Sequence, residues 1–210
     1  MRAIIIANGE INNISIIEQS ICEGDYIIAL DGGLKYVDKA GIKPNVIVGD
    51  FDSVDMGLVE KYRLKNVELQ SFPVRKDFTD MEIGIDIAAK AGAEEIVLLG
   101  ALGGRLDHAL GNVLNMQQAA NMGISISIID EAQHVFLLKK GRKFKYKKDT
   151  TISIIPLTEQ VTGVKTTNLS YPLNNETLFM GFSRGLSNVF DEDEAEIIFS
   201  GGILLVIVNV

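Results

Sequence analysis

The sequence predicts an α/β N-terminal domain with a mostly parallel sheet, followed by an all-β, sandwich-like C-terminal domain. Short runs of apolar, β-branched residues alternate with segments of helical period in the first part of the chain. Such continuously apolar strands, joined by helices, are typical of a parallel sheet that is covered on both faces. From about residue 132 onward the helical period disappears, and short apolar runs follow one another. We therefore expect two domains, 1–130 and 131–210.

The N-terminal domain is expected to alternate strands with helices. The strands are predicted at residues 3–7, 26–30, 46–48, 96–99 and 124–129. The helices are predicted at residues 14–22, 34–40, 56–64, 80–91 and 106–122. Cys22 closes the first of these helices, and we expect it to be buried and inert.

The C-terminal domain is expected to contain antiparallel strands only. They are predicted at residues 134–138, 144–146, 151–155, 161–166, 197–200 and 203–208. The segment Ser200-Gly201-Gly202 separates the last two strands and predicts a hairpin between them. The acidic run at 191–196 predicts a solvated turn between strands.

Composition excludes several classes of protein. The chain has 20 Lys and Arg residues against 28 Asp and Glu, a net charge of −8, which disfavours a nucleic-acid coat. One cysteine and two histidines exclude an internal disulfide framework or a cysteine-rich zinc site, and they disfavour a histidine-built metal site. The N-terminal apolar run is too short for a signal peptide, and the run at 203–208 is too short to cross a bilayer. We expect a cytoplasmic protein.

Aspartate and glycine residues follow three of the predicted parallel strands. They occur at 31–33, 49–53 and 100–108. In an open parallel α/β sheet, ligands bind beyond the carboxyl ends of the strands, where loops lead into helices. The three segments are therefore predicted to share one edge of the sheet.

Asp50 and Asp52 allow two interpretations. In an extended segment, side chains at i and i+2 point the same way, so the two carboxylates could reach one cation. Alternatively, Gly49-Asp50 forms a turn, and Asp52 or Ser53 caps the next helix. Phe51 between them is expected to be packed.

The segment 75–82 predicts a helix start with additional chemistry. Thr79 and Glu82 have the spacing of a capping box, and Asp80 would favour the positive end of the helix. This structural interpretation does not account for Lys76 and Asp77, which lie just before the cap. Asp80 could also complete a metal site at the edge of the sheet.

The residues gathered at this edge predict metal-assisted phosphoryl transfer. Crowded carboxylates raise one another's pKa unless a cation joins them, and Mg²⁺ commonly binds a few carboxylates together with substrate phosphates. Arg105 and Lys76 would then hold phosphate oxygens, and the Gly103-Gly104 backbone could approach an anion. The chain has neither a Walker motif nor a Gly-x-Gly-x-x-Gly fingerprint. The acidic residues of this edge are Asp31, Asp50, Asp52, Asp77, Asp80 and Asp107, and the basic ones are Arg75, Lys76 and Arg105.

Five sequence blocks together resemble the bacterial thiamine pyrophosphokinase family. They are LDGGLKY (30–36), PNVIVGDFDS (44–53), RKDFTDMEIGI (75–85), GALGGRLDHALGN (100–112) and GLSN (185–188). The resemblance implies an ATP-binding α/β domain, a C-terminal β domain that helps to bind thiamine, and a homodimer with active sites between subunits. It also implies Mg²⁺-dependent transfer of the pyrophosphoryl group of ATP to the thiamine hydroxyl, which leaves AMP.

The resemblance also implies residue roles. The Mg²⁺ ligands would be Asp50, Asp52 and Asp80. The nucleotide or its phosphates would be positioned by Asp31, Gly32, Lys76, Thr79 and Arg105. Thiamine would be contacted by Asp107, Ser187 and Asn188. We also consider Asp107, with Arg105 beside it, a candidate catalytic residue that orients the hydroxyl or accepts its proton; an alternative assigns Asp107 only to the pyrimidine ring.

One departure concerns the aromatic residue that binds the thiamine ring. Some members of the family, mainly eukaryotic, stack this ring on a tryptophan, and the present chain has none. Phe190, close to Ser187, is a candidate for that aromatic face. Two other functions stay open at this point: a related metal-dependent transferase with another nucleotide or alcohol, and a non-catalytic nucleotide or vitamin sensor on the same fold.

Overall fold

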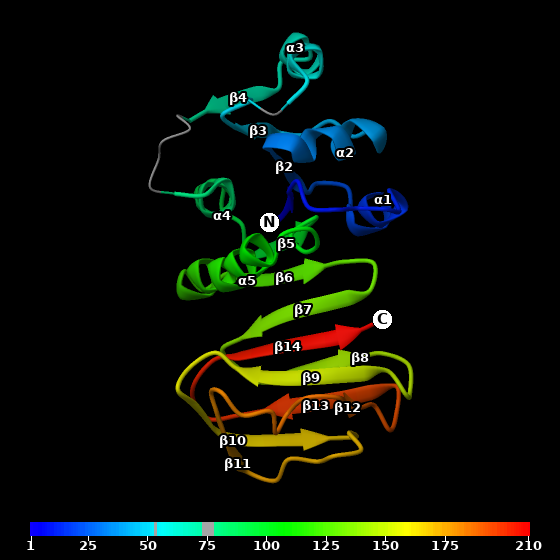
Figure 1. Ribbon diagram of the computed structural model, residues 1–210, viewed down its shortest axis with the longest axis vertical. Helices are drawn as coiled ribbons and strands as arrows, with labels where there is room; N and C mark the ends of the chain where they lie inside the picture. Colours follow the sequence, from blue (N-terminus) through cyan, green and yellow to red (C-terminus); the bar gives the residue numbers. More distant parts are fainter. Residues whose placement is uncertain (53, 73–77) are drawn as a thin grey trace. The chain divides into compact units, whose positions relative to one another are not determined.

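The structure, a computed structural model, describes residues 1–52, 54–72 and 78–210. The chain divides into two compact units, Met1–Glu131 and Ala132–Val210 (Figure 1). Lys76 and Asp77, which the sequence places near the site, and Ser53, a candidate helix cap, lie outside the described residues. In the described part of the chain, no helix is both long enough and apolar enough to span a membrane.

The N-terminal unit contains a parallel sheet, as predicted. Its strands lie in the order β6-β5-β1-β2-β3-β4, and each neighbouring pair is parallel. The sequence did not predict β4, since three of its four residues (ELQS) are polar and none has a β-branched side chain. The strands are β1 (Arg2–Ile6), β2 (Tyr26–Leu30), β3 (Val46–Gly49), β4 (Glu68–Ser71), β5 (Glu95–Leu99) and β6 (Ser125–Ile129).

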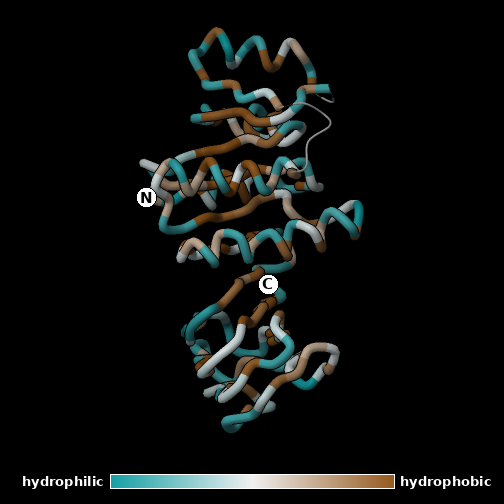
Figure 2. The backbone as a smooth tube through the Cα atoms, turned by 90° about the vertical axis from the view of Figure 1, so that its left-hand side faces the viewer, coloured by the Kyte–Doolittle hydropathy of each residue, from teal (hydrophilic) through white to brown (hydrophobic). Residues whose placement is uncertain are grey.

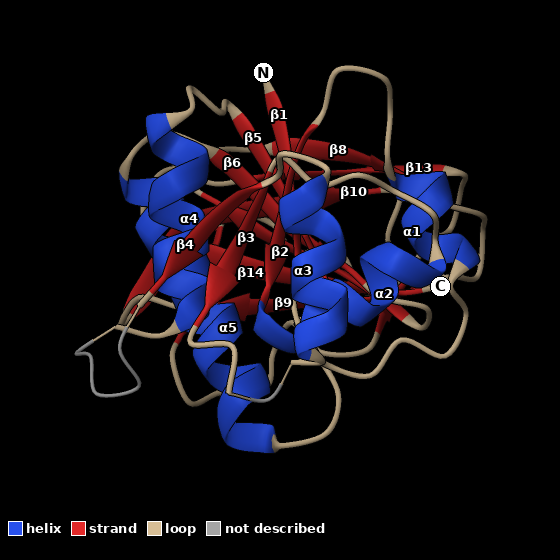
Figure 3. Cartoon of the chain, turned by 90° about the horizontal axis from the view of Figure 1, so that it is seen from above, coloured by secondary structure: helices blue, strands red, loops and turns tan. Residues whose placement is uncertain are grey.

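Helices cover both faces of this sheet (Figure 3). On one face, Gly84 of α4 lets the helix pack closely on Ile5 and Leu30, while on the other face Ile4 and Ile6 join the core formed with α1, α2 and α3. Except for β4, the parallel strands bury side chains on both faces and are mostly apolar, as the hydropathy colouring shows (Figure 2). The helices are α1 (Ser15–Ser20), α2 (Leu34–Lys39), α3 (Met56–Leu64), α4 (Asp80–Lys90) and α5 (Leu106–Asn121), with a short 3₁₀ helix at Asp31–Gly33.

The prediction for Cys22 was wrong, because α1 ends earlier than its apolar pattern suggests. Ile21, the residue after the helix, already has extended backbone angles, so Cys22 lies beyond α1 and is exposed. The backbone N–H of Cys22 donates instead to the Asp25 carboxylate at 2.7 Å.

Asp25 links the start of β1 to the loop before β2. The Arg2 guanidinium donates to both its carboxylate oxygens, at 2.6 and 3.0 Å, and the Asp25 side chain is only 6% exposed. Burial raises the pKa of Asp25, but the hydrogen bonds from Arg2 and from the Cys22 N–H more than offset burial and leave the pKa below its usual value of 3.8.

We expect Asp25→Asn to lower the free energy of unfolding by about 2 kcal/mol, because it removes a charged, buried hydrogen-bond acceptor. Since the pKa is lowered in the folded state, this contribution is present above pH 3.8 and is lost as the pH falls through the lower folded-state value. Urea unfolding should therefore show a gap between wild type and variant that is wide at pH 7 and narrows toward pH 3. The exposed neighbour Glu23→Gln is the control and should change stability little; a pH-independent gap for Asp25→Asn would contradict the assignment.

The C-terminal unit is a sandwich of two antiparallel sheets, as predicted. The sheets have the strand orders β12-β9-β14-β7 and β11-β10-β13-β8, and apolar side chains from both form one core. The sequence did not predict β11 and β12. The strands are β7 (Gln133–Leu138), β8 (Arg142–Lys145), β9 (Thr151–Pro156), β10 (Gln160–Thr167), β11 (Glu176–Phe179), β12 (Asn188–Val189), β13 (Glu194–Ile198) and β14 (Leu204–Asn209).

The predicted hairpin at 200–202 was wrong. Strand β13 pairs with β8 and β10, whereas β14 pairs with β7 and β9, so the glycine-containing segment crosses from one sheet to the other. Two apolar runs separated by glycines indicate a chain reversal but do not say whether the runs belong to the same sheet.

The acidic run at 191–196 is a turn only in its first half. Its second half forms β13, where Glu194 and Glu196 lie opposite Lys145 and Lys143 of β8. The Lys143 ammonium is 3.2 Å from Glu194, and that of Lys145 is 3.9 Å from it. The acidic run and the basic strand β8 therefore form a ladder of opposite charges, which stabilises the pairing of the two strands.

Candidate active site

The N-terminal unit contains a cleft of about 940 Å³ beyond the carboxyl ends of β1, β2 and β5. The predicted site residues that border it come from four loops and helix starts: Asp31, Asp50, Thr79, Asp80, Arg105 and Asp107. Gly32 and Asp52 are not among its lining residues. The parallel arrangement thus brings together most of the residues predicted for this edge of the sheet.

The loops after β2 and β3 have left-handed backbone conformations at non-glycine residues. Asp31 has φ 41° and Phe51 has φ 61°. Such conformations cost about 1–3 kcal/mol each and are concentrated at functional sites. Because of the turn at Phe51, the segment from Asp50 to Asp52 is not extended, and the two side chains do not both reach the cleft as a simple strand would allow.

Asp50 forms the turn that one interpretation predicted, and it also borders the cleft, where the other interpretation expected a cation. Its carboxylate accepts a hydrogen bond from the Asp52 N–H at 3.0 Å, which closes this turn. The helix cap predicted at Asp52 or Ser53 is instead Asp55, which accepts from the Gly57 N–H at 2.8 Å. Phe51 is partly buried against the core, as expected.

The acidic side chains of the cleft are electrostatically coupled. Burial raises the pKa of Asp31, the negative charges of Asp50 and Asp80 raise it further, and the backbone N–H groups of Gly32 and Phe51 offset only part of this. One carboxylate oxygen of Asp31, Oδ1, is buried and has no hydrogen-bond partner among the described residues.

This arrangement fits a hard divalent cation that is only partly coordinated by protein. Within the described part of the chain, no three Asp, Glu, His or Cys side chains form a ready ligand cluster. Mg²⁺, however, usually keeps several waters and needs only one or two carboxylates together with substrate phosphates. A cation here would neutralise the coupled charges and would give the buried oxygen of Asp31 a favourable electrostatic environment.

Thr79 caps α4 as the sequence predicted. Its hydroxyl accepts from the Glu82 N–H at 3.2 Å, and the Glu82 carboxylate accepts from the Thr79 N–H at 2.7 Å. The Asn115 amide of α5 also donates to the Thr79 hydroxyl at 3.3 Å. The capping box therefore fixes Asp80, the first residue of the helix, at the wall of the cleft.

Arg105 and Asp107 pair with each other at the start of α5. The guanidinium donates to both carboxylate oxygens, at 2.5 and 3.1 Å, and these hydrogen bonds lower the pKa of Asp107. Gly103 and Gly104, with φ 88° and 68°, form the turn before the helix. The N-cap residue Arg105 makes no side-chain hydrogen bond to the first turn of this helix, whereas the His108 N–H donates to the Asp107 carboxylate at 3.0 Å.

Sequence reasoning missed several polar side chains of the cleft. The Lys35 ammonium of α2 donates to the Asn8 amide oxygen at 2.8 Å, and Asn112 donates to the Ala101 carbonyl at 2.8 Å. Asn8 follows β1 directly, so the same strand-end argument that selected Asp31 could have found it. Lys35 lies inside a helix, where the sequence gives no comparable signal.

Ser187 and Asn188 lie in the C-terminal unit. Ser187 is exposed with φ 55°, and its N–H donates to the Ser153 hydroxyl at 3.1 Å. Asn188 is only 3% exposed. Phe190 is fully buried in the sandwich core, where its ring meets that of Tyr146 edge-on, so it cannot offer a face to a ligand and that prediction was wrong.

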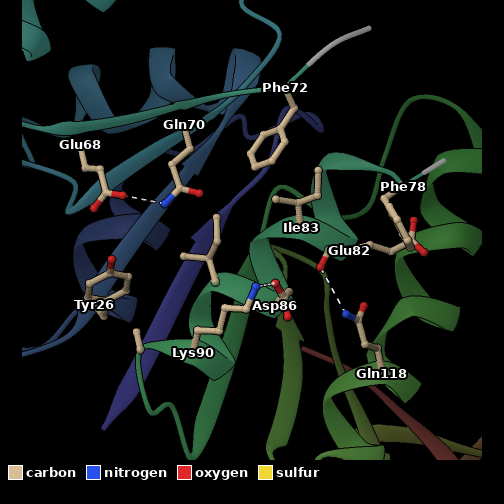
Figure 4. Close-up of a pocket in the computed structure, with 12 residues that line it drawn as sticks. Tyr26, Glu68, Gln70, Phe72, Phe78, Glu82, Ile83, Asp86, Lys90 and Gln118 are labelled. Atoms are coloured by element: carbon tan, nitrogen blue, oxygen red, sulfur yellow. Dashed lines mark hydrogen bonds and ion pairs between the residues drawn. The ribbon is translucent and has the colours of Figure 1, made fainter. Parts of the chain in front are cut away.

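A second groove, of about 740 Å³, lies between β4 and α4 and is bordered by Phe72 and Ile83 (Figure 4). Its polar side chains largely satisfy one another. Lys90 pairs with Asp86 at 2.6 Å, and Gln70 donates to Glu68 at 2.7 Å (Figure 4). The coupled aspartates border the first cleft instead, which makes that cleft the candidate active site.

Comparison with known proteins assigns both units to one family. The family model described as "Thiamin pyrophosphokinase, catalytic domain" matches residues 17–128, and the model described as "Thiamin pyrophosphokinase, vitamin B1 binding domain" matches residues 133–204. Together the two matches extend over most of the chain.

Individual relatives agree with this match. The chain is 30% identical to a thiamine pyrophosphokinase of Bacillus subtilis over 206 residues, which are 97% of this chain and 96% of the relative. A crystal structure of the Bacillus subtilis enzyme superimposes with a TM-score of 0.92 and 27% identity, covering 100% of this chain and 99% of that one. A thiamin pyrophosphokinase structure from Geobacillus thermodenitrificans gives 0.88 and 29%, covering 100% and 98%.

Proposed function

The chain belongs to the thiamin pyrophosphokinase family, and on this basis we propose that the acidic cleft is where it transfers a pyrophosphoryl group from ATP to thiamine. The observation that best supports the site is the convergence of coupled aspartates with Arg105 at the start of α5. Acidic groups suit a metal-bound triphosphate, and a cationic group at the start of a helix suits its phosphate oxygens.

In this reaction the hydroxyl oxygen of thiamine attacks the β-phosphorus of ATP. The bond from the β-phosphorus to the oxygen bridging it to the α-phosphate breaks, AMP leaves with that oxygen, and the hydroxyl proton is released. A primary alcohol is a weak nucleophile, so alignment and charge neutralisation should contribute more than proton abstraction.

We assign Mg²⁺ to Asp50, Asp52 and Asp80, with Asp31 beside them. The cation, when bound, neutralises charge on the phosphates. Asp50 and Asp80 border the cleft, and the Asp50 turn keeps Asp52 next to this pair. The unpartnered oxygen of Asp31 supports its presence near the cation or the nucleotide.

The remaining cleft residues would bind the substrates. Arg105 would hold phosphate oxygens, together with Lys76 from the segment outside the described residues and Gly32 beneath the nucleotide. Thr79 would place the phosphates at the start of α4. Asp107 would orient the thiamine hydroxyl, and Ser187 and Asn188 would belong to the thiamine subsite.

The domain expected at 1–130 would bind ATP, and the domain expected at 131–210 would help to bind thiamine. We also propose a homodimer with active sites between subunits, which sedimentation equilibrium would test. We further propose a cytoplasmic location, where the co-substrate ATP is available.

Product analysis tests the function directly. Purified protein with ATP, Mg²⁺ and thiamine should form AMP and thiamine diphosphate in equal amounts, and neither should form when EDTA removes the metal. Formation of ADP instead would indicate simple phosphoryl transfer by a related kinase. Binding of ATP and thiamine without turnover would indicate a sensor. Either outcome, ADP formation or binding without turnover, would contradict the proposal.

A further inference from the structure

Two lysine or arginine side chains border the candidate active site in the described part of the chain, and their partners differ. Lys35 and Arg105 line the cleft together with a larger number of acidic residues. Arg105 donates to both carboxylate oxygens of Asp107, so the charge of its guanidinium is offset. Lys35 instead donates to the Asn8 amide oxygen at 2.8 Å, and its ammonium lies 4.6 Å from the centroid of the Tyr36 ring. Because both of these partners are uncharged, neither of them neutralises the ammonium.

The two partners of Lys35 are themselves held in place. Asn8 lies in the loop after β1, and its side chain lies directly against Gly32, where a Cβ would be only 2.5 Å from the Asn8 amide. Tyr36 is buried, and its hydroxyl accepts a hydrogen bond from the Ile11 N–H at 3.3 Å. The ammonium of Lys35, an exposed residue, therefore contacts two fixed groups at the wall of the cleft.

We propose that Lys35 binds phosphate oxygens of the nucleotide, and that Asn8 is a positioning residue that holds the Lys35 ammonium at the cleft. This inference rests on the proposed function, in which ATP is the anionic substrate. An ammonium group has three N–H donors, so the hydrogen bond to Asn8 leaves two for a ligand. Lysine binds phosphate as a point charge, and hydrogen bonds between ionised groups are stronger than those between neutral groups.

The charge of Lys35 distinguishes between the two substrates. Thiamine carries a permanently cationic thiazolium ring, which an ammonium group repels, whereas the same group attracts the triphosphate of ATP. The acidic side chains of the cleft repel a free triphosphate, and a cation that is not paired with a carboxylate offsets part of this repulsion. We therefore expect Lys35 to contribute to the binding of the nucleotide and not to the binding of thiamine.

Removal of the Lys35 charge tests the phosphate contact. We expect Lys35→Met to raise the KM for ATP, and the calorimetric Kd for a non-hydrolysable ATP analogue with Mg²⁺, about tenfold or more, while the Kd for thiamine stays within about twofold. Lys35→Arg keeps the charge and should recover most of the lost affinity. The matched control is Lys39→Met, at the exposed end of the same helix, which should bind the analogue like wild type. Unchanged binding of the analogue in Lys35→Met, an equal loss in Lys39→Met, or an equal loss of thiamine affinity would overturn the inference.

A double-mutant cycle tests the role of Asn8. Asn8→Ala removes the oxygen that accepts from Lys35 and leaves the ammonium in place. We expect a several-fold rise in the Kd for the ATP analogue in the wild-type background and no further rise in the Lys35→Met background. Fully additive effects, in variants with unchanged circular dichroism, would mean that Asn8 does not act through Lys35. Wild-type turnover to AMP separates the two hypotheses, since its absence refutes the proposed function, whereas normal turnover with unchanged nucleotide binding in Lys35→Met refutes only the inference.

Discussion

Asp50→Asn is expected to reduce pyrophosphoryl transfer by about a thousandfold or more while leaving the fold intact. Asp50 borders the cleft, contributes to the raised pKa of Asp31, and is the carboxylate that we assign, with Asp80, to the cation. Asparagine can still accept the hydrogen bond from the Asp52 N–H, so the turn should persist while the charge is lost. Steady-state assays over a range of Mg²⁺ concentrations, with Mn²⁺ binding measured by electron paramagnetic resonance, would show the loss.

The matched control is Asp149→Asn in the C-terminal unit. Asp149 is exposed and has φ 68°, a left-handed conformation that asparagine tolerates well, so the same change of charge should leave activity near wild type. Asp52→Asn is expected to be as damaging as Asp50→Asn. Near-normal Mg²⁺-dependent activity in both the Asp50 and Asp52 variants would refute the metal assignment.

Asp107→Asn has the second largest expected effect, a fall in kcat of about 10²- to 10⁴-fold with thiamine binding retained. Asparagine preserves the size of the side chain but carries no charge with which to orient or deprotonate the hydroxyl. Calorimetry with thiamine and a non-hydrolysable ATP analogue, alongside single-turnover assays, separates binding from chemistry. A collapse of thiamine affinity with little change in kcat would instead favour a role limited to the pyrimidine ring.

The pH dependence of this variant carries a further check. The hydrogen bonds from Arg105 lower the pKa of Asp107, so its carboxylate remains charged throughout the neutral range. A group that is already ionised at pH 5 cannot produce the acidic limb of a neutral pH–rate profile. We therefore expect any limb between pH 5 and 7 to be the same in wild type and in Asp107→Asn.

The elements that the sequence predicted best have clear boundaries in the sequence. The bounds of β2 and α3 agree with the structure residue for residue, because β2 is an apolar run between Asp25 and Asp31 and α3 begins directly after its cap, Asp55. Strand β4 was missed because it is a mostly polar edge strand, and the hairpin at 200–202 was wrong because periodicity does not specify the sheet to which a strand belongs. The alternation of strands and helices predicted the fold class, but not each pairing.

The same distinction applies to the site. Asp31, Asp80 and Asp107 could be placed together because parallel strands end at one edge, which is a property of the fold class. The burial of Phe190 and the hydrogen bonds between the Asn188 amide and the Tyr171 backbone depend on contacts between distant segments. A local sequence pattern does not predict such contacts. Cys22 was misplaced for a similar reason, since one early change of backbone conformation ends its helix.

The ladder of opposite charges between β8 and β13 is part of an uneven distribution of charge between the two units. Acidic residues of the 191–196 run are matched by lysines, and residues 132–210 together carry nine Lys and Arg against eight Asp and Glu. Residues 1–131 carry 11 against 20, so the entire excess belongs to the unit with the acidic cleft. An approaching nucleotide tetra-anion therefore meets long-range repulsion before it reaches Arg105, and moderate ionic strength should speed its capture rather than slow it.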